Sequence, residues 1–340
     1  MAHQIQFPEP HRAVLVPFEV GVPAGRQLLL QAECSVISAG TEGAHFTGLE
    51  IEHPGRRTPL TYPINSTGYG HLARVVSVGP EATRFHVGDR VLTLAPHASH
   101  WLWDSERLTL KIADDLPGER AVFTRMAGVG ITALRKSSAQ PGDTVAVIGL
   151  GLVGNFAAQL FQLAGCEVLG LDRVEARLEQ ARACGVRHVA STADQDVADV
   201  VNAWTGGKGA RIVVEAIGEP TLIERAVQCT RRHGEVILLG SPRRRVTGEI
   251  TPMLSRIHLT GISMIGALEW LYSIPESDFI RFSILENYRQ IAGWIAEGRL
   301  QVDPLRTHVL SPAQCQEAYA GLAEHRDTYT GVVFDWSRLD

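Results

Sequence analysis

Cysteine is scarce and unpatterned in this sequence. The 340 residues include five cysteines, an odd number, and no two of them form a Cys-X-X-Cys pair. We therefore expect neither a disulfide framework nor a four-cysteine zinc site, because both need paired cysteines at suitable spacing. Reduced thiols are the expected state, which is typical of a cytoplasmic protein.

Long hydrophobic runs are lacking as well. Gly, Asp or Arg interrupts the longest apolar stretches well before the 18 or so residues that suggest a membrane span. The first residues, MAHQIQFPEPHRAVLV, show no basic segment followed by an apolar one, which is the pattern of a secretory signal. We expect no membrane partner and a cytoplasmic location.

An excess of positive charge is also absent. Lys and Arg number 32 against 37 Asp and Glu, which gives a formal net charge of -5. Nucleic acid is not an expected partner, because proteins that bind it carry a basic footprint. The apolar fraction of 45% is too high for a disordered chain, and the length suggests two domains or one large one.

The sequence pattern differs between the first third of the chain and the rest. Up to about residue 118, short β-branched runs alternate with turns that contain Gly or Pro, which predicts a β-rich domain. Helical spacing begins at 119, and from 144 strands alternate with helices, which predicts a parallel, doubly wound sheet of the Rossmann type. The predicted fold class is α/β, with one domain at 1–118, completed by 300–340, and a Rossmann domain at 119–299.

The predicted elements of the second half follow one another at regular spacing. Strands are expected at 144–149, 167–172, 211–218 and 235–240, and helices at 153–165, 174–185 and 222–232. Beyond residue 285 we expect helices over 288–298 and 314–324, and strands over 307–312 and 330–336.

A glycine-rich phrase, Gly149-Leu150-Gly151-Leu152-Val153-Gly154, joins the first of these strands to the helix that follows. In a strand–turn–helix context this phrase is the dinucleotide-binding fingerprint. Gly149 permits the tight turn, Gly151 lets the backbone approach a pyrophosphate, and Gly154 lets the helix pack closely on the strand. Free N–H groups at the helix N-terminus complete the phosphate site. We therefore assign Gly149, Gly151, Leu152, Val153 and Gly154 to cofactor binding.

An acidic residue, Asp172, ends the next predicted strand, 18 positions after Gly154. A carboxylate there accepts hydrogen bonds from the adenosine ribose and repels a 2′-phosphate, so it favours NAD over NADP. Arg173 follows directly and softens that preference. The alternative interpretation of Asp172 is a solvated acid at the end of a strand. Gly240 and Ser241, after another predicted strand, are assigned to the same cofactor site.

The order of these parts resembles the medium-chain dehydrogenase/reductase superfamily. Two further phrases carry the resemblance: Val78-Gly79-Pro80-Glu81 with Phe85-His86-Val87-Gly88-Asp89-Arg90-Val91, and Pro141-Gly142-Asp143-Thr144-Val145. The resemblance covers nearly the whole chain. It implies a GroES-like catalytic domain beside the Rossmann domain, a nicotinamide cofactor, a small-molecule substrate and a homodimer.

Many members of this superfamily bind a catalytic zinc ion, and this chain departs from their ligands at each position. Ser38 replaces the cysteine, Tyr69 replaces the histidine of a Gly-His-Glu phrase, and Arg125 replaces a carboxylate or thiolate. The four-cysteine structural lobe is missing too. A hydroxyl, a phenol and a fixed cation do not make the tetrahedral set that zinc prefers. We expect no zinc and no other metal.

Without zinc, another group must polarise the substrate oxygen and carry the proton. Tyr69 is the first candidate, because the resemblance places its phenol at a zinc-ligand position; the alternative is an aromatic side chain that only fills the vacated space. Arg125 is assigned either to favour ionisation of Tyr69 or to hold an anionic group of the substrate. The alternative for Arg125 is an ion pair with Glu42.

The resemblance also implies a proton relay. Thr41 matches the hydroxyl that passes a proton from the substrate to the cofactor ribose, and Glu42 matches an acid behind the metal site. His45 follows closely, where an imidazole can release the proton to water. The alternative interpretation of His45 is a histidine in a surface loop.

A His-X-X-His pair, His97 and His100, is predicted to lie in a loop. With Glu42 or His45 it offers a non-standard metal site, but this signal is weak. The preferred interpretation is that His97, His100 and Trp101 line the substrate pocket. Ser38 is assigned to the same pocket.

Two short phrases, 37–42 (ISAGTE) and 239–243 (LGSPR), resemble a zinc-less branch with bacteriochlorophyllide dehydrogenase-like proteins and dehydrogenases of sugar-modifying clusters. This resemblance implies a zinc-independent, NAD-dependent dehydrogenase that acts on a secondary alcohol or its ketone. A polyol, cyclitol or sugar derivative is the expected substrate class. The alternatives are a quinone or enoyl reductase, and a nucleotide-binding protein without catalytic activity.

Overall fold

The computed structural model describes residues 1–49 and 60–339, which pack as two compact units. The first unit comprises residues 1–125, 272–298 and those from 306 onward, and the second comprises 126–271 and 299–305. The segment 272–298, which we assigned to the Rossmann domain, thus packs within the first unit. Its helix α9 (Ile284–Ala296) turns an apolar face inward and contacts α2 (Gly118–Ala121) and β7 (Thr109–Lys111).

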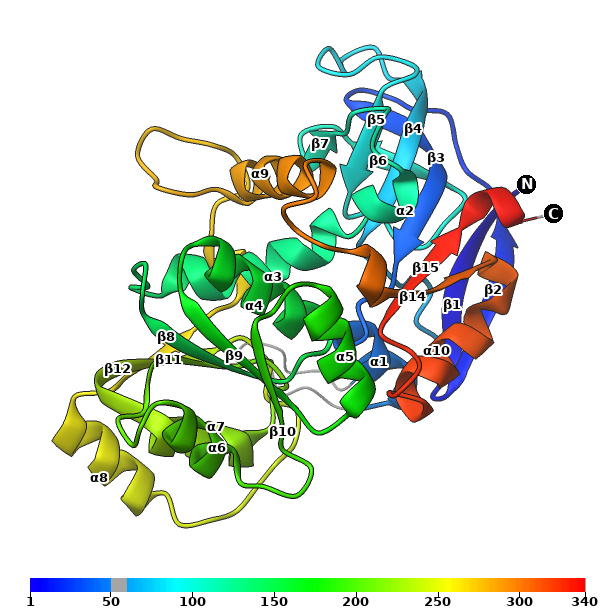
Figure 1. The fold of residues 1–340 in the computed structure, drawn as a ribbon. Helices are drawn as coiled ribbons and strands as arrows, with labels where there is room; N and C mark the ends of the chain where they lie inside the picture. Colours follow the sequence, from blue (N-terminus) through cyan, green and yellow to red (C-terminus); the bar gives the residue numbers. More distant parts are fainter. Residues whose placement is uncertain (50–59, 340) are drawn as a thin grey trace. The chain divides into compact units, whose positions relative to one another are not determined.

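The second unit is built on a six-stranded parallel sheet (Figure 1). The order β10-β9-β8-β11-β12-β13 is that of a doubly wound Rossmann fold, so the predicted fold class is confirmed. The strands are β8 (Thr144–Ile148), β9 (Glu167–Asp172), β10 (His188–Ser191), β11 (Ala210–Glu215), β12 (Thr230–Leu238) and β13 (Ser263–Gly266).

Alternating apolar side chains explain why helices cover both faces of this sheet. In β8, Val145 and Val147 point to one face, and Ala146 and Ile148 point to the other. Three helices pack on the first face: α3 (Thr124–Lys136), α4 (Leu152–Leu163) and α5 (Glu175–Ala183). Three others pack on the second face: α6 (Val197–Trp204), α7 (Pro220–Cys229) and α8 (Thr251–Thr260).

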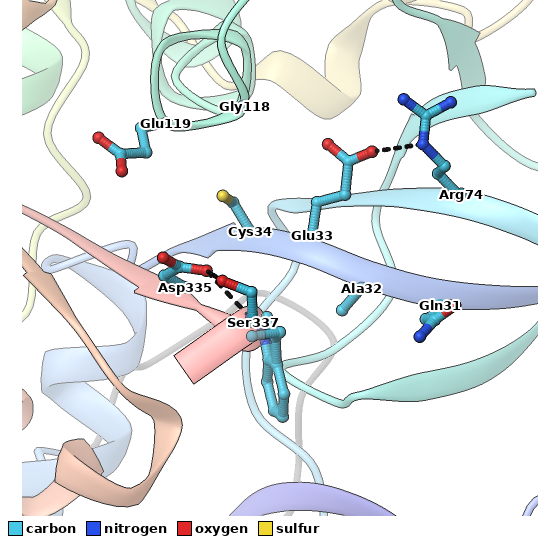
Figure 2. Close-up of a pocket in the computed structure, with 10 residues that line it drawn as sticks. Gln31, Ala32, Glu33, Cys34, Arg74, Gly118, Glu119, Asp335 and Ser337 are labelled. Carbon is cyan, nitrogen blue, oxygen red and sulfur yellow. Dashed lines mark hydrogen bonds and ion pairs between the residues drawn. The ribbon is translucent and has the colours of Figure 1, made fainter. Parts of the chain in front are cut away.

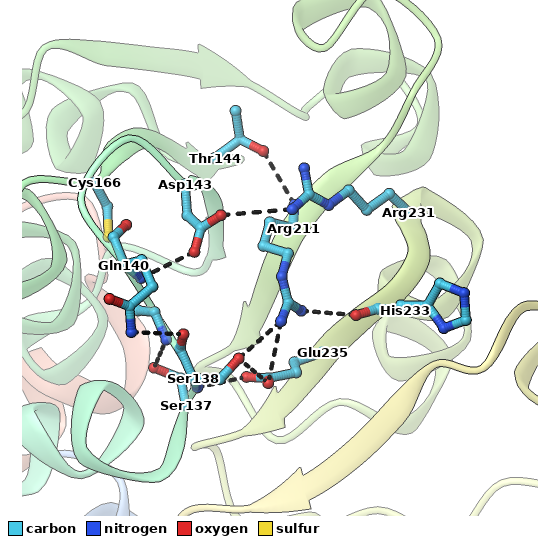
Figure 3. Close-up of polar contacts among 11 residues, drawn as sticks. Ser137, Ser138, Gln140, Asp143, Thr144, Cys166, Arg211, Arg231, His233 and Glu235 are labelled. Atoms are coloured by element: carbon cyan, nitrogen blue, oxygen red, sulfur yellow. Dashed lines mark hydrogen bonds and ion pairs between the residues drawn. The ribbon is translucent and has the colours of Figure 1, made fainter.

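A polar network ties β11 and β12 to the loop that precedes β8 (Figure 3). Glu235 accepts hydrogen bonds from the N–H of Ser138, at 3.0 Å, and from its hydroxyl. Arg211 donates to the Ser138 hydroxyl oxygen at 2.8 Å and to the carbonyl of His233 at 2.8 Å. These contacts lie toward the amino ends of the strands, and the loops at the opposite edge are the ones that bind ligands in such sheets.

The first unit is β-rich, as predicted. Its seven-stranded sheet has the order β14-β15-β3-β4-β5-β7, with β6 paired to β3, and β1 and β2 form a separate hairpin. The strands not yet introduced are β1 (Ala2–Glu9), β2 (Arg12–Phe18), β3 (Gln27–Val36), β4 (His71–Val78), β5 (Arg90–Thr93), β6 (His100–Asp104), β14 (Arg306–Leu310) and β15 (Gly331–Asp335). The remaining helices are α1 (Thr41–Thr47) and α10 (Cys315–Glu324). Over residues 1–49 and 60–339, no helix is both long and apolar enough to cross a membrane.

Several element boundaries differ from the prediction, and three of the differences have a visible cause or consequence. The helical segment expected from 119 divides into α2 and α3, because Phe123 and Arg125 donate their N–H groups three residues back and tighten the turn. The helix expected over 222–232 ends at Cys229, since Thr230 already pairs with β11. His100 begins β6 and so does not lie in a loop.

A buried histidine, His71, lies in β4. Its side chain has no exposed surface, and Nε2 lies 3.1 Å from the carbonyl oxygen of Ala98. Burial lowers the pKa of His71 to about 4, because a charged imidazole would lose its hydration there. The ring is therefore neutral in the folded protein at neutral pH.

We predict that His71 makes the fold sensitive to acid between pH 6.5 and about 4. In this window the unfolded chain binds a proton at the imidazole and the folded chain does not, so the free energy of unfolding falls as the pH falls. Over the whole window the loss is about 3 kcal/mol. His71→Gln keeps a donor for the Ala98 carbonyl but cannot titrate.

Urea unfolding at a series of pH values should give a shallower pH dependence for His71→Gln than for the wild type. His86→Gln is the control, because the His86 side chain is 77% exposed. Identical slopes in the wild type and His71→Gln would contradict the prediction.

Candidate functional site

Helix α1 places a carboxylate inside the first unit. Glu42 stands in the first turn of this helix, and its side chain is buried. Its N–H donates to the carbonyl of Ser38 at 2.9 Å, and its Oε1 accepts the N–H of Ser38 at 2.8 Å. Glu42 thus holds the main chain of Ser38 at both of its polar groups.

The second carboxylate oxygen of Glu42 meets side chains from three other parts of the chain. Oε2 lies 2.9 Å from His97 Nε2, 2.6 Å from the Tyr319 hydroxyl and 3.4 Å from the Thr67 hydroxyl. Burial alone would raise the pKa of the Glu42 carboxyl, but the charge and hydrogen bond of His97 and the other donors outweigh burial and lower it. Glu42 is therefore a buried anion, and groups other than Arg125 engage both of its oxygens.

His97 belongs to this buried network. We expected it beside a substrate pocket, but its side chain has no exposed surface. Nδ1 lies 2.7 Å from Ser35 Oγ, which also accepts the indole N–H of Trp336 at 2.9 Å. A Cβ on Gly68 would lie 2.5 Å from the imidazole, so a glycine at this position leaves room for the ring.

Tyr69 stands between two glycines and contacts two other predicted site residues. Its hydroxyl donates a hydrogen bond to Ser38 Oγ. The Arg125 guanidinium lies over the Tyr69 ring, 4.6 Å from its centroid, and Arg125 Nε donates to the Tyr69 carbonyl at 3.2 Å. A Cβ on Gly70 would lie 3.1 Å from Arg125 Cγ, so this glycine permits the close approach. The structure thus brings Ser38, Tyr69 and Arg125 together.

A zinc ion does not fit this set of side chains. The two neutral hydroxyl groups of Ser38 and Tyr69 already bond to each other, and the buried Arg125 cation would repel a metal ion. In the part of the chain that the structure describes, no three His, Cys, Asp or Glu side chains gather in a way that could hold a metal.

Thr41 and His45 lie four residues apart on α1 and share one side of it, whereas Glu42 and Phe46 are buried on another. His45 is thus helical, and it is not a residue of a surface loop. The carbonyl of His45 accepts a hydrogen bond from the Tyr62 hydroxyl. The proton relay through Thr41 and His45 stays a prediction.

His100 and Trp101 make contacts that differ from those of His97. His100 Nδ1 lies 3.3 Å from Ser99 Oγ, and the Trp101 ring packs on Phe18 at 5.9 Å between centroids. Each lines its own shallow hollow on the first unit, beside His3 for His100 and beside Phe18 for Trp101. The structure does not bring them into the group of Ser38, Tyr69 and Arg125.

A larger hollow of about 420 Å³ surrounds Cys34 in the first unit (Figure 2). Burial and the nearby carboxylates of Asp335, Glu33 and Glu119 raise the pKa of the Cys34 thiol to about 12. Such a thiol is a poor nucleophile, because the thiolate is the reactive form. Cys34 is therefore not a candidate nucleophile, and the cluster around Tyr69 remains the candidate site.

The turn between β8 and α4 forms a glycine cradle in the second unit. Gly149 has a φ of 93°, and a Cβ on Gly154 would lie only 1.8 Å from the carbonyl oxygen of Gly149. A Cβ on Gly151 would have no neighbour closer than 4.0 Å, so space lies open before the helix. Leu152 and Val153 begin α4, whose N-terminus has no side-chain cap among the described residues. The cradle fits a dinucleotide phosphate, which free N–H groups bind.

Asp172 ends β9 beside this turn and is buried. Its carboxylate accepts the N–H of Leu150 at 2.8 Å and that of Val174 at 3.0 Å. Arg173 is exposed, whereas Arg177, in the first turn of α5, lies 3.6 Å from Asp172. Arg177 is not among the residues predicted from the sequence, although its place in the first turn of the helix after Asp172 is a usable signal.

Gly240 and Ser241 follow β12 and press against the loop after β11. A Cβ on Gly240 would lie 2.1 Å from the nitrogen of Gly218, and one on Gly218 would lie 2.1 Å from the carbonyl oxygen of Ser241. Glu215, at the end of β11, accepts the N–H of Gly218 at 2.9 Å. Burial raises the pKa of Glu215 although backbone donors oppose it. These loops meet at the carboxyl edge of the sheet, where such folds bind nucleotides.

Comparison with known proteins identifies some relatives that match about half of the chain and others that match nearly all of it. Residues 153–279 match a family model described as zinc-binding dehydrogenase, a range that contains none of Ser38, Tyr69 and Arg125. An uncharacterized zinc-type alcohol dehydrogenase-like protein of Escherichia coli is 23% identical over 354 residues, which cover 94% of each chain. A 2-haloacrylate reductase of a Burkholderia species is 32% identical over 176 residues, 49% of this chain and 52% of the relative.

A solved structure shows the same fold. It is that of a candidate zinc-binding dehydrogenase from Sinorhizobium meliloti 1021 bound to NADP. The TM-score is 0.80 at 17% sequence identity, and the match covers 98% of this chain and 99% of the other.

Two glycine variants should separate packing from ligand binding in the cradle. Gly154→Ala should lower the free energy of unfolding by about 1–3 kcal/mol, because the new methyl group meets the backbone of the turn. Gly151→Ala should leave the unfolding temperature of the free protein unchanged but reduce its rise with NADH, because its methyl group occupies the space for phosphate. Thermal unfolding with and without NADH measures both effects. An equal loss of stability in the two free variants would contradict the assignment of Gly151.

Proposed function

We propose that this chain, an oxidoreductase similar to medium-chain dehydrogenases and reductases, works without zinc on a secondary alcohol or the corresponding ketone. The proposed substrate is a polyol, cyclitol or sugar derivative. The resemblance of the phrases at 37–42 and 239–243 supports this class, and so do the hydroxyl groups of Ser38, Thr41 and Tyr69, which suit a polyhydroxylated ligand.

One observation carries the proposal. Ser38, Tyr69 and Arg125 occupy the places that the resemblance gives to zinc ligands, and Tyr69 contacts both of the others. A hydroxyl pair beside a fixed cation can do what a Lewis acid does for a carbonyl: it donates a hydrogen bond to the oxygen on which negative charge develops.

The nicotinamide cofactor, held at the glycine cradle and beside Asp172, supplies the hydride chemistry when bound. The cradle of Gly149, Gly151 and Gly154 leaves space for its pyrophosphate before the N-terminus of α4. The buried carboxylate of Asp172 disfavours a 2′-phosphate, so we propose NAD as the preferred cofactor. Arg177 lies beside that carboxylate and partly offsets its charge.

The residues of the first unit move the proton. In alcohol oxidation, the Ser38 and Tyr69 hydroxyl groups hold the substrate hydroxyl and relay its proton: the hydroxyl that takes the substrate proton gives up its own, and the His45 imidazole is the base that finally accepts it. In ketone reduction the same transfers run in reverse. Thr41 and His45, one turn apart on α1, then offer a hydroxyl and an imidazole that lead toward solvent. Glu42 is buried and fully engaged, so it positions Ser38 and does not exchange the proton itself.

The second candidate is reduction of an activated double bond, as in a quinone or enoyl reductase. The observation that favours it is the similarity to the 2-haloacrylate reductase, whose name states that chemistry for the relative. The same hydroxyl pair would then protonate the carbon or oxygen that receives negative charge.

We also propose a cytoplasmic homodimer that forms through β13, a strand at one edge of the six-stranded sheet. An edge strand offers unpaired backbone groups to a second copy, and Met264, Leu268 and Trp270 expose apolar surface beside it. Light scattering after gel filtration tests the dimer, and a monomer at micromolar concentration would contradict it.

Tyr69→Phe is the direct test of the proposed function. We expect kcat with NAD and the best alcohol of a polyol, cyclitol and sugar panel to fall by roughly 10²–10⁴-fold, because the variant removes the hydroxyl that shares the proton with Ser38. The dissociation constant for NADH should not change. Absorbance at the NADH band measures turnover, and NADH fluorescence measures binding.

Tyr329→Phe is the control, because it makes the same change at a tyrosine whose hydroxyl lies 3.4 Å from Glu317, outside the cluster, and it should keep the wild-type rate. A Tyr69→Phe enzyme with unchanged kcat would contradict the role of Tyr69. NADH consumption with enones or quinones, and none with any ketone of the panel, would favour the second candidate.

A further inference from the structure

The buried part of the first unit contains a continuous hydrogen-bond path that ends at Tyr69. Glu42 holds the N–H of Ser38 at 2.8 Å, and Ser38 Oγ accepts the hydrogen bond of the Tyr69 hydroxyl. The orientation of the hydroxyl pair therefore depends on where the Glu42 carboxylate lies. A carboxylate without partners in this place would rotate or draw water toward it.

His97 fixes one side of that carboxylate. Its ring is held on both nitrogens, by Glu42 Oε2 at 2.9 Å and by Ser35 Oγ at 2.7 Å. The ring packs edge-on against Phe334, 5.2 Å between centroids, and Gly68 leaves the space it fills. Gly68 also directly precedes Tyr69, so His97 touches both the carboxylate and the segment that carries the phenol.

Tyr319 fixes the other side. Its hydroxyl lies 2.6 Å from Glu42 Oε2, and its ring packs against Phe7 at 4.8 Å and Phe46 at 5.6 Å between centroids. Burial and the Glu42 charge raise the pKa of the Tyr319 phenol well above its usual value, so the phenol stays a donor. No feature of the superfamily resemblance pointed to Tyr319, which is 277 residues from Glu42.

We propose that His97 and Tyr319 are positioning residues for proton transfer, which act through Glu42 and Ser38 on Tyr69. This inference rests on the proposed function of the Ser38 and Tyr69 hydroxyl groups. Neither residue is placed against the substrate, because Glu42 and Ser35 engage both ring nitrogens of His97, and Glu42 engages the Tyr319 hydroxyl. Their contribution is to hold the carboxylate, and with it the Ser38 main chain, in one orientation through the reaction.

The hydrogen bonds to Glu42 Oε2 differ in length, so variants that remove them should reduce kcat to different degrees. Tyr319→Phe removes a bond to Glu42 of 2.6 Å and keeps the packed ring, whereas Thr67→Val removes a weaker bond to Glu42, of 3.4 Å, and keeps the shape of the side chain. Because hydrogen bonds weaken with distance, Tyr319→Phe should reduce kcat by roughly 10- to 100-fold and Thr67→Val by less. KM and the NADH dissociation constant should stay near the wild-type values in both.

Thr109→Val is the matched control. Thr109 accepts the indole N–H of Trp103 at 2.9 Å, so this variant also removes a buried hydrogen-bond partner in the first unit. Thr109 makes no bond to Glu42, whose partners are named above. The control should lose stability to a similar degree as Tyr319→Phe and keep kcat.

The decisive experiment is a double-mutant cycle. Tyr319→Phe is combined with Tyr69→Phe, and kcat is measured for the wild type, both single variants and the pair. If Tyr319 acts through the Tyr69 hydroxyl, its loss should reduce the rate little, by less than about twofold, once that hydroxyl is gone. The same 10- to 100-fold reduction in both backgrounds would overturn the inference and leave the role of Tyr69 intact.

Amide hydrogen exchange gives a second readout that needs no substrate. Tyr319→Phe should speed exchange of the Ser38 N–H at least about tenfold, and Thr109→Val should leave it unchanged. Equal exchange of Ser38 in the wild type and Tyr319→Phe would also overturn the inference. A Tyr69→Phe variant with the wild-type rate would instead refute the proposed function, so the two failures are distinguishable.

Discussion

The candidate site depends on one buried charge, the Glu42 carboxylate. A carboxylate without water is costly unless donors surround it, and the fold supplies them from the Ser38 main chain, His97, Thr67 and Tyr319. These groups come from segments far apart in the chain. Because one anion needs all of these donors, the start of α1, the segment just before Tyr69 and helix α10 lie next to one another around the Glu42 carboxylate.

The same requirement explains the glycines beside Tyr69. Gly68 leaves room for the His97 ring, and Gly70 leaves room for Arg125. With both glycines in place, the Tyr69 hydroxyl reaches Ser38 while the guanidinium covers its ring. In the proposed function, hydrogen-bond donors held by packing take the part that the resemblance gives to a metal ion. Such donors stabilise developing charge only when they are oriented before the reaction begins.

The glycine turn and the sheet of the second unit were predictable from local sequence patterns. The turn 149–154 joins a strand to a helix that are adjacent in the chain, and the strand alternation of β8 and β11 is visible in a few residues. The close packing of Gly154 on Gly149 followed from that pattern, whereas the hydrogen bond from the Leu150 N–H to Asp172 did not. Arg177 required only one further helical turn.

The contacts of the candidate site in the first unit were less predictable, because they join residues that are far apart in the sequence. The superfamily resemblance points to Ser38, Tyr69 and Arg125, but it gives no sign of Tyr319, and His97 is buried where the sequence suggested a pocket. His97 lies 55 residues from Glu42, and no spacing rule connects them. A usable signal was the pair of glycines around Tyr69, since two glycines flanking an aromatic residue indicate that other groups approach the backbone closely.

Metal dependence tests the central claim most directly. The wild-type enzyme would be dialysed against a chelator, its zinc content measured by mass spectrometry, and its turnover of the best substrate compared before and after one equivalent of zinc. The account predicts the same kcat in the zinc-free and zinc-supplemented protein. Activity that disappears with the metal and returns in proportion to bound zinc would contradict it.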